Sequence, residues 1–397
     1  MRILTVVGAR PNFVKVAPLL DEMKRYPEVE TILVHTGQHY DYQMSRAFFE
    51  ELEIPKPHIN LDVGSGTPVR QTAEIMLRLE RVMEQTQPHV MVAVGDVNST
   101  LSAALTAVKM GYPIAHVEAG LRSLDRNMPE EINRILTDAL ADFLFVTEQS
   151  GVENLLREGR PKERIYFVGN VMIDALKRSL ERARRHPLPD DLGLMDRSMI
   201  NLDRPFGLVT LHRPATVDDP TVLREVWTAL ENVAAEIPLI FPVHPRTQSR
   251  LEACGLWRRA GGSSAGILRV RPLTYLEFLH LQSKATLVVT DSGGVQEETT
   301  ALGVPCLTVR ETTERPITVT EGTNVLVGLN GTRLIDEVHT VLRDGGKKGR
   351  IPNLWDGQAS ARIVRTLVHV IPQTLAHSHD GWHDCLAGVG MAAQTVA

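Results

Sequence analysis

The chain has 397 residues, of which 43% are hydrophobic and 23% charged, and it carries a formal net charge of −5. This length allows two or three domains with sizeable cores, and the pI of about 6.3 is unlike that of a protein built to hold nucleic acid. The three cysteines, Cys254, Cys306 and Cys385, are odd in number and far apart, so they indicate neither a disulfide framework nor a zinc site. No apolar run reaches the length of a membrane helix or a signal-peptide core, which predicts a cytoplasmic protein with no membrane partner.

Short runs of Val, Ile and Leu recur along the chain, separated by segments with helical periodicity. Near-continuous apolar strands that are covered on both faces are typical of parallel sheets in α/β proteins. Twelve such runs are too many for one ordinary sheet. The first six are predicted at residues 2–7, 30–36, 89–96, 113–120, 143–148 and 164–170, and the second six at 206–213, 238–244, 266–272, 285–294, 304–309 and 323–328.

A proline-containing stretch with little periodicity, residues 184–205, separates the two groups of strands. We therefore predict an α/β fold of two doubly wound domains that face each other across a cleft, covering residues 1–175 and 176–356. A helix at 357–371 is predicted to join the N-terminal domain, and residues 374–397 are expected to be a flexible tail. His377, His379, His383 and Cys385 lie at this end of the chain, where their irregular spacing favours disorder over a metal site.

Polar residues follow the apolar strands at the points where the chain leaves each predicted sheet. Gly8–Arg10 follow the first strand, residues 95–100 follow the third, and Glu118 ends the fourth. His212 and His244 end two strands of the second group. Because ligands of doubly wound sheets bind beyond the carboxyl ends of the strands, these side chains are predicted to converge on the cleft.

The sequence "TDSGGVQEE" predicts a strand, a turn of small residues and a helix. Ser292, Gly293 and Gly294 would let a phosphate approach the free N–H groups at the helix start. A tight turn with Ser292 as the helix cap explains the same residues equally well. Glu297 or Glu298 would accept hydrogen bonds from ribose hydroxyls, although acids in a first helical turn also complement the helix dipole.

No glycine fingerprint of a dinucleotide site and no P-loop motif occurs in the chain, so neither NAD nor a P-loop nucleotide is predicted. Arg10 and Lys15 flank the start of the first predicted helix, where their charges suit a diphosphate. For Lys15 alone, a solvated helix face is an equally good interpretation.

Asp96, Glu118 and Glu130 come from three successive loops of the N-terminal half. Carboxylates gathered at a cleft can have their pKa values pushed apart, which suits acid–base catalysis. Glu130 also fits an ordinary helix start, with a proline before it and acids in the first turn. His212 and His244 together favour ligand contacts, whereas a lone histidine is more often a satisfied core residue.

The motifs "GARPNFVKVAPL", "VGDVNST", "HVEAGLRS", "MPEEINR", "LHRP", "PVHP", "DSGGVQEE" and "TTERP" occur in this order across about residues 8–330. Together they resemble the non-hydrolysing UDP-N-acetylglucosamine 2-epimerases. The resemblance implies two Rossmann-like domains in the arrangement called glycosyltransferase-B, and activity without a metal or NAD. It also implies the interconversion of UDP-N-acetylglucosamine and UDP-N-acetylmannosamine for cell-surface polysaccharide, through elimination and re-addition of UDP, by a homodimer that binds no nucleic acid.

Matching of the motifs residue by residue implies a role for each side chain of the site. Asp96, Glu118 and Glu130 would be the acid–base set, with His212 also at the reacting diphosphate. The substrate-binding set would comprise Arg10, Lys15 and Arg315 at the diphosphate with Ser292, Gly293 and Gly294, Glu298 at the ribose, Phe278 near the base, and His244.

Three other functions fit parts of this pattern. A 2-epimerase of a diacetamido-glucuronate UDP-sugar would share the same scaffold. A glycosyltransferase of this architecture would need an acceptor groove, often beside a basic or aromatic patch, for which the sequence gives no sign. A non-catalytic sensor of nucleotide sugars would be favoured by loss of the acids, yet all three carboxylates are present.

Overall fold

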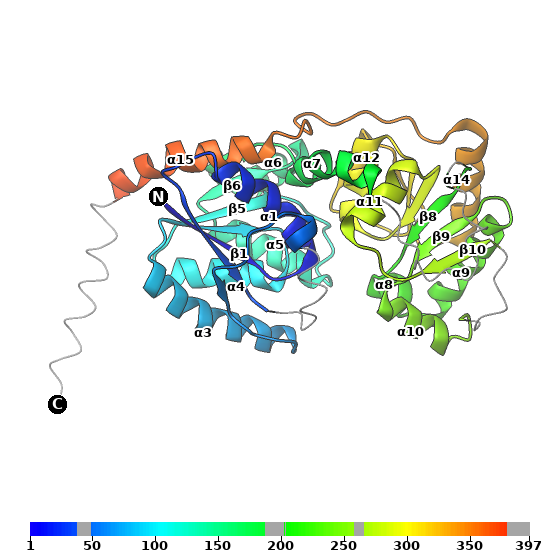
Figure 1. Cartoon of the computed structure of the whole chain (residues 1–397), viewed down its shortest axis with the longest axis horizontal. Helices are drawn as coiled ribbons and strands as arrows, with labels where there is room; N and C mark the ends of the chain where they lie inside the picture. The colour runs from blue at the N-terminus through cyan, green and yellow to red at the C-terminus, as the bar shows by residue number, and fades with distance from the viewer. Residues whose placement is uncertain (38–48, 187–201, 203, 258–265, 379–397) are drawn as a thin grey trace.

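The computed structural model describes residues 1–37, 49–186, 202, 204–257 and 266–378, with the backbone alone for Arg10 and residues 371–378. The chain forms two parallel sheets, each with helices on both faces, set side by side along the long axis of the molecule (Figure 1). The predicted α/β class with two doubly wound sheets is therefore confirmed. No helix among the described residues combines the length and the apolar character needed to cross a membrane.

The first sheet has seven strands in the order β3-β2-β1-β4-β5-β6-β7, and every described pairing in it is parallel. Strands β2 and β3 lie on one side of β1, and β4 to β7 follow on the other side, so the strand order switches between β1 and β4. In a doubly wound sheet, ligands bind at this switch point. The strands are β1 Arg2–Val7, β2 Glu30–His35, β3 Ile59–Asn60, β4 Val90–Val94, β5 Ile114–Ala119, β6 Phe143–Val146 and β7 Ile165–Phe167.

Helices that connect these strands cover both faces of the first sheet. Thr67 and Asn170 each cap a helix, with their side chains accepting hydrogen bonds from Arg70 N and Met172 N. The helices are α1 Arg10–Met23, α3 Pro68–Thr86, α4 Asn98–Lys109, α5 Pro129–Leu140, α6 Gln149–Arg157 and α7 Val171–Arg185, with a short 3-10 turn at Lys162–Arg164.

The second sheet has six strands in the order β10-β9-β8-β11-β12-β13, again with every described pairing parallel. The strand order of this sheet switches sides between β8 and β11. The strands are β8 Gly207–Thr210, β9 Leu239–Pro242, β10 Ile267–Val270, β11 Leu287–Thr290, β12 Cys306–Thr308 and β13 Asn324–Leu326. Its helices are α8 Pro214–Val217, α9 Pro220–Ala234, α10 Pro245–Ala253, α11 Tyr275–Lys284, α12 Gly293–Leu302, α13 Pro316–Thr320 and α14 Gly331–Asp344.

All twelve predicted strands are present, each within or close to its predicted bounds. The sequence analysis missed β3, because two residues are too few to show any periodicity. The last helix, α15, spans Ala359–Ser378, so residues 374–378 of the expected flexible tail are helical. The rest of that tail, including His379, His383 and Cys385, lies outside the described residues.

After α14 the chain runs back from the second sheet to the first, and α15 lies along the helices of the first sheet (Figure 1). Asp174 on α7 fixes the start of α15, since its carboxylate accepts hydrogen bonds from Ala359 N at 3.1 Å and Ser360 N at 2.7 Å. We call β1–α7 with α15 the N-terminal half, and β8–α14 the C-terminal half. The predicted boundary at residues 175–176 falls within α7, and the exact residue that separates two domains stays a prediction.

The two halves touch through α7, which packs against α1 on one side and against α11 and α12 on the other. His280 on α11 lies with its ring Nδ1 2.7 Å from the carbonyl oxygen of Ala183, near the end of α7. Glu51 accepts a hydrogen bond of 3.1 Å from Tyr275 N at the start of α11. The carboxyl ends of β4 and β5 therefore lie close to the helices of the C-terminal half.

Candidate functional site

Lys15 and Glu118 form a buried ion pair at the carboxyl ends of the central strands of the first sheet. Lys15 Nζ lies 2.5 Å from Glu118 Oε2, and the two side chains are 7% and 2% exposed. Gly95 leaves room for this pair, because a side chain there would put its Cβ 3.2 Å from Lys15 Nζ and 3.6 Å from Glu118 Oε2. The interpretation of Lys15 as a solvated helix residue is therefore wrong.

Glu118 has an unusual backbone. Its φ is +74°, a left-handed conformation that costs a side-chain-bearing residue free energy, and the register between β5 and β6 shifts between Val117 and Ala119. This shift re-aims the carboxylate at the end of the strand. Glu118 Oε1 has no hydrogen-bond partner among the described residues. One oxygen of Glu118 thus binds Lys15, and the other is left for a ligand.

Asp96 lies at the end of β4, half-buried and paired with Arg134 of α5. Arg134 Nη1 is 2.5 Å from Asp96 Oδ2, and the Asn133 side chain donates a hydrogen bond of 2.9 Å to the Asp96 carbonyl. Burial raises the pKa of the Asp96 carboxyl, but the charges of Arg134, Lys15 and Arg315 outweigh it and hold that pKa below its usual range. Asp96 is therefore ionised at neutral pH.

Glu130 and Glu131 begin α5 and have different surroundings. Glu131 is fully buried, accepts hydrogen bonds from Ser123 N at 3.0 Å and Leu124 N at 2.9 Å, and pairs with Arg134 at 2.7 Å. Glu131 thus fixes the loop that follows β5. Glu130 is half-buried and makes no hydrogen bond or ion pair with any other described residue. No measured contact joins Glu130 to Asp96 or Glu118, so its acid–base role stays a prediction.

The start of α12 in the C-terminal half carries the small residues that were predicted to receive phosphate. Ser292 is the N-cap residue of α12, as the tight-turn interpretation predicted, but its side chain makes no capping hydrogen bond. At Gly293 an added Cβ would lie 2.5 Å from Glu314 Oε1. The small residues let a carboxylate approach this helix end, as they would let a phosphate approach it.

Three arginines surround Glu314 beside this helix end. Arg310 Nη2 lies 2.7 Å from Glu314 Oε2, Arg213 Nη2 lies 3.8 Å from Oε1, and Arg315 Nη1 lies 3.9 Å from Oε1. Burial raises the pKa of Glu314, but the charges of these arginines outweigh it and hold that pKa well below its usual range. The cations around the carboxylate suit an anionic ligand.

Arg315 connects the two halves of the molecule. Its Nε lies 2.7 Å from Glu297 Oε1 on α12, and its Nη2 lies 3.8 Å from Glu118 Oε2 of the N-terminal half. Asn170, the cap of α7, donates a hydrogen bond of 2.8 Å to the same oxygen of Glu297. The acids of one sheet and the cations of the other thus meet at a buried charged cluster.

His212 and His244 lie near each other at the ends of β8 and β9, with ring centroids 6.0 Å apart. His212 is partly exposed, and its Nδ1 lies 3.2 Å from the buried carboxylate of Asp291. That carboxylate also accepts hydrogen bonds from His212 N and Arg213 N. The His244 ring accepts a hydrogen bond of 3.2 Å from Arg246 N at the start of α10. Neither ring belongs to the apolar core, so the alternative of satisfied core histidines is wrong.

Glu298 is almost completely buried on α12. Burial raises the pKa of its carboxyl to about 7, and a hydrogen bond of 3.0 Å from the Tyr275 hydroxyl only partly offsets that effect. Phe278, one helical turn further along α11 than Tyr275, packs against the apolar cluster that contains Val270 and Val295. The ribose and base contacts predicted for Glu298 and Phe278 stay predictions.

Glu148, at the end of β6, is a buried acid that the sequence analysis did not select. Burial raises the pKa of its carboxyl to about 7, and the Ser150 hydroxyl, 2.5 Å from Glu148 Oε1, and the charge of Arg315 offset only part of this effect. Its position after an apolar strand was the available signal, as it was for Glu118. Arg134 was missed because an arginine inside an amphipathic helix is usually solvated.

The predicted contact of Arg10 and the possibility of a metal site can be compared with the described residues only in part. Arg10 begins α1 beyond β1, but its side chain lies outside the described part of the chain. Among the described residues, no three or more His, Cys, Asp or Glu side chains are grouped so that they could hold a metal ion.

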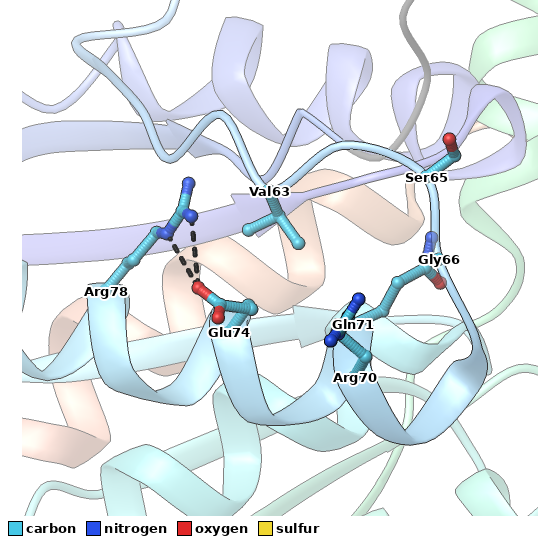
Figure 2. Close-up of a pocket in the computed structure, with 7 residues that line it drawn as sticks. All are labelled: Val63, Ser65, Gly66, Arg70, Gln71, Glu74 and Arg78. Carbon is cyan, nitrogen blue, oxygen red and sulfur yellow. Dashed lines mark hydrogen bonds and ion pairs between the residues drawn. The ribbon is translucent and has the colours of Figure 1, made fainter.

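A separate hollow of about 330 Å³ lies on the N-terminal half, between the loop at Val63–Gly66 and α3 (Figure 2). One of its two arginines already has partners, since Arg78 pairs with Glu74 at 3.0 Å and donates hydrogen bonds to the carbonyls of Leu61 and Asp62. None of the predicted site residues lines it. These contacts hold the loop onto α3.

Comparisons with known proteins agree with this geometry. Residues 21–368 match the family described as UDP-N-acetylglucosamine 2-epimerase. The UDP-N-acetylglucosamine 2-epimerase of Methanocaldococcus jannaschii is 40% identical over 372 residues, which are 93% of this chain and 99% of that protein. The UDP-2,3-diacetamido-2,3-dideoxy-D-glucuronate 2-epimerase of Pseudomonas aeruginosa is also 40% identical, over 92% of this chain and 99% of that protein.

A solved structure of the Methanocaldococcus jannaschii UDP-GlcNAc 2-epimerase, in complex with UDP-GlcNAc and UDP, superimposes with a TM-score of 0.84 at 38% identity. The match covers 93% of this chain and 100% of that chain. Such neighbours have a glycosyltransferase-B-like pair of domains, which confirms the architecture expected from the sequence motifs. The chain belongs to the UDP-N-acetylglucosamine 2-epimerase family.

Proposed function

We propose that the protein catalyses the reversible interconversion of UDP-N-acetylglucosamine and UDP-N-acetylmannosamine, and so supplies precursors of cell-surface polysaccharide. The observation that carries this proposal is the buried cluster in which Glu118 of one half meets Arg315 of the other. Carboxylates for proton transfer and cations for a diphosphate thereby share one site. Family membership supports a UDP-sugar as the substrate.

The chemistry explains why both kinds of charge are needed. The C2 proton of the sugar is not beside a carbonyl, so simple deprotonation is difficult. In the proposed path a base removes that proton, its electron pair forms the C1–C2 double bond of 2-acetamidoglucal, and UDP departs with the C1–O pair. UDP then adds back at C1 while an acid delivers a proton to the opposite face of C2.

Asp96 is the best-supported base of the described carboxylates. Arg134, Lys15 and Arg315 keep it ionised, so it can accept a proton across the neutral pH range. Glu118 and Glu130 are the candidates for the acid on the other face of the ring. The free oxygen of Glu118 gives it the clearer access to a ligand.

Stabilisation of the departing diphosphate would come from both halves. Lys15 and Arg315 would lie on one side of it, and the diphosphate contact of Arg10 stays a prediction. On the other side the N–H groups at the start of α12 face an anion in a water-poor site, where electrostatic stabilisation is strong. His212 would donate a hydrogen bond to the same group.

No step of the elimination–addition path transfers a hydride, so it requires no NAD. Lys15 and Arg315 can supply the positive charge that a metal ion would give to the diphosphate, and we propose that neither NAD nor a metal is used. The homodimer implied by the resemblance and the cytoplasmic location expected from the apolar runs of the sequence stay predictions. Size-exclusion chromatography with light scattering would test the dimer.

A second candidate substrate is the UDP-2,3-diacetamido-glucuronate sugar. It is favoured by one observation: the enzyme named for that sugar matches this chain as well as the UDP-N-acetylglucosamine enzyme does, at 40% identity. The reaction would be the same, and only the groups at C3 and C6 would differ.

Proton NMR of each UDP-sugar with the protein in D₂O would test the proposal. We expect UDP-N-acetylmannosamine signals to grow from UDP-N-acetylglucosamine while deuterium replaces the proton at C2. Release of free N-acetylmannosamine would show a hydrolysing enzyme instead. Turnover of the diacetamido sugar alone would assign the second candidate, and no change in either sugar would refute epimerisation.

A further inference from the structure

His116 lies on β5, two residues before Glu118, and its side chain is completely buried. Both ring nitrogens face oxygen atoms. Nδ1 is 2.6 Å from Asp138 Oδ1 on α5, and Nε2 is 2.9 Å from the carbonyl oxygen of Gly95. No step of the proposed reaction uses this residue.

The partners of His116 restrict its protonation. A neutral imidazole donates from one nitrogen only, whereas both neighbours here are acceptors if Asp138 is ionised. Asp138 Oδ2 accepts a hydrogen bond of 3.0 Å from Gly120 N and lies 2.7 Å from Arg122 Nη1. Burial raises the pKa of Asp138, but His116, Arg122 and the Gly120 amide outweigh it and hold that pKa below its usual range.

His116, Asp138, Arg122 and Glu158 form one network, in which a protonated His116 would balance the charges. Arg122 also pairs with Glu158 at the end of α6, with Arg122 Nη2 2.7 Å from Glu158 Oε2. A protonated His116 would thus join Arg122 as the second cation facing the carboxylates of Asp138 and Glu158. A neutral His116 would leave one ring nitrogen with its lone pair directed at an oxygen, and the buried group would carry an uncompensated negative charge.

The His116 network connects the two loops that carry Asp96 and Glu118. The Gly95 carbonyl belongs to the residue directly before Asp96, and Gly95 N donates a hydrogen bond of 3.0 Å to Val117 O. Gly120, whose amide binds Asp138, follows Glu118 by two residues. A shift of His116 would therefore move Asp96 and Glu118 relative to each other.

We propose that His116 is a positioning residue that sets the spacing of Asp96 and Glu118, and that it does so with both ring nitrogens protonated between Asp138 and the Gly95 carbonyl. The proposal rests on the proposed epimerase function for its catalytic consequence. Its structural claim, the doubly donating ring, stands on the contacts alone. An ordinary core histidine would donate once.

Nitrogen NMR of the whole protein with ¹⁵N-labelled histidine tests the structural claim without any substrate. At about pH 8 an ordinary histidine is mostly neutral, but we expect both nitrogens of His116 to carry protons. The signals are assigned by their absence from the spectrum of His116→Asn. Asp138→Asn, in which the ring loses its carboxylate, should convert the signals to those of a neutral ring. One unprotonated nitrogen in the native protein would overturn the proposal.

Kinetics of the same variants test the positioning role. Because small displacements of catalytic groups are costly, we expect His116→Asn and Asp138→Asn each to lower kcat about tenfold or more. The Kd for UDP should change by less than about threefold, since neither residue contacts the proposed diphosphate cations. Glu153→Gln is the control: it removes an exposed carboxylate of α6 that lies outside the network and should leave kcat unchanged.

The outcomes separate the two proposals. Folded His116→Asn with the kcat of the native protein would refute the positioning role. An equal loss of kcat in Glu153→Gln would show that the loss is not specific to His116 and Asp138, and would also refute the positioning role. Absence of epimerisation by the native protein would refute the proposed function, while the NMR result would still decide whether the ring is doubly protonated.

Discussion

Neighbouring cations, rather than contact with water, keep the Asp96 carboxylate ionised. We expect Asp96→Asn to lower turnover by ~10² or more, because the amide cannot accept the C2 proton. The fold should remain intact, since Arg134 keeps its ion pair with Glu131. Turnover by NMR and far-UV circular dichroism would measure the two effects.

The exposed Glu153 provides a control, because Glu153→Gln changes a carboxylate on the outer surface of α6 and should leave turnover unchanged. Glu118→Gln and Glu130→Gln should lose turnover to a similar extent as Asp96→Asn. Near-native turnover in any of the three variants would remove that residue from the acid–base set.

Glu148 should make the stability of the protein depend on pH. Its pKa is about 7 in the folded chain, above the ordinary value of 4.5. The folded state therefore binds a proton that the unfolded state releases between these two values. Protonation of Glu148 therefore favours the folded state: its contribution to stability is fully present below about pH 4.5 and is lost as the pH rises through about 7.

The variant Glu148→Gln mimics the protonated side chain at every pH. We expect it to match the native protein near pH 5 and to be more stable near pH 8, by up to about 3 kcal/mol. Urea unfolding at both pH values would measure the difference, with Glu153→Gln as the exposed control. An equal effect of Glu148→Gln at the two pH values would contradict the raised pKa.

The site residues that could be predicted were those at the ends of apolar strands. Glu118 and His212 were predicted because each ends an apolar strand, and Lys15 because its charge near the start of the first predicted helix suits a diphosphate. Arg134 and Glu131 could not be selected in this way, because the sequence does not tell which face of α5 is buried. The pattern "PEE" indicates a helix start but cannot show that Glu131 binds the loop while the Glu130 side chain has no partner among the described residues.

At the level of elements, the stability of the first turn of α12 should depend on Gly293 more than on Gly294. We expect Gly293→Ala to destabilise the protein by about 1–3 kcal/mol, because its Cβ would lie 2.5 Å from Glu314 Oε1, and Arg310 holds that carboxylate in place through the other oxygen, Oε2. UDP binding should weaken as well. Thermal unfolding and calorimetric titration with UDP would measure both effects.

Gly294→Ala is the matched control at the neighbouring position. The nearest atom to its Cβ would be the terminal methyl of Met172, at 3.4 Å, which belongs to a flexible side chain. Alanine also has a higher helix propensity than glycine, so stability should be unchanged or slightly increased. Equal destabilisation by both substitutions would contradict the specific role of Gly293.

The elements themselves could be predicted from the sequence more completely than the site. Parallel strands covered on both faces are apolar along their whole length, which made twelve of the thirteen described strands recognisable. The pairing order of the strands required the structure, because apolar runs such as "LVVT" and "LIFP" carry no sign of their neighbours. The continuation of α15 to Ser378 was not predicted, because the sequence after residue 371 shows no clear helical period.

For the molecule as a whole, we expect full activity in excess EDTA without added nicotinamide. Lys15 and Arg315 already supply the positive charge that a divalent cation would give to a departing diphosphate. Turnover by NMR with and without EDTA measures this in the full chain, so that residues 379–397 are included. Activity that disappears with EDTA and returns with an added metal would contradict the metal-free mechanism.

The position of α15 determines when the N-terminal half can be completed during synthesis. Ile363, Val364 and Leu367 of this helix are fully buried in the core cluster that also contains Val16 and Leu19 of α1. The C-terminal half, in contrast, is built from one continuous stretch with its own core. Released chains that end at residue 355, and therefore lack α15, should protect the second sheet from protease while the first remains sensitive. A nascent chain would then finish its second half before its first, the reverse of the usual order in which domains leave the ribosome.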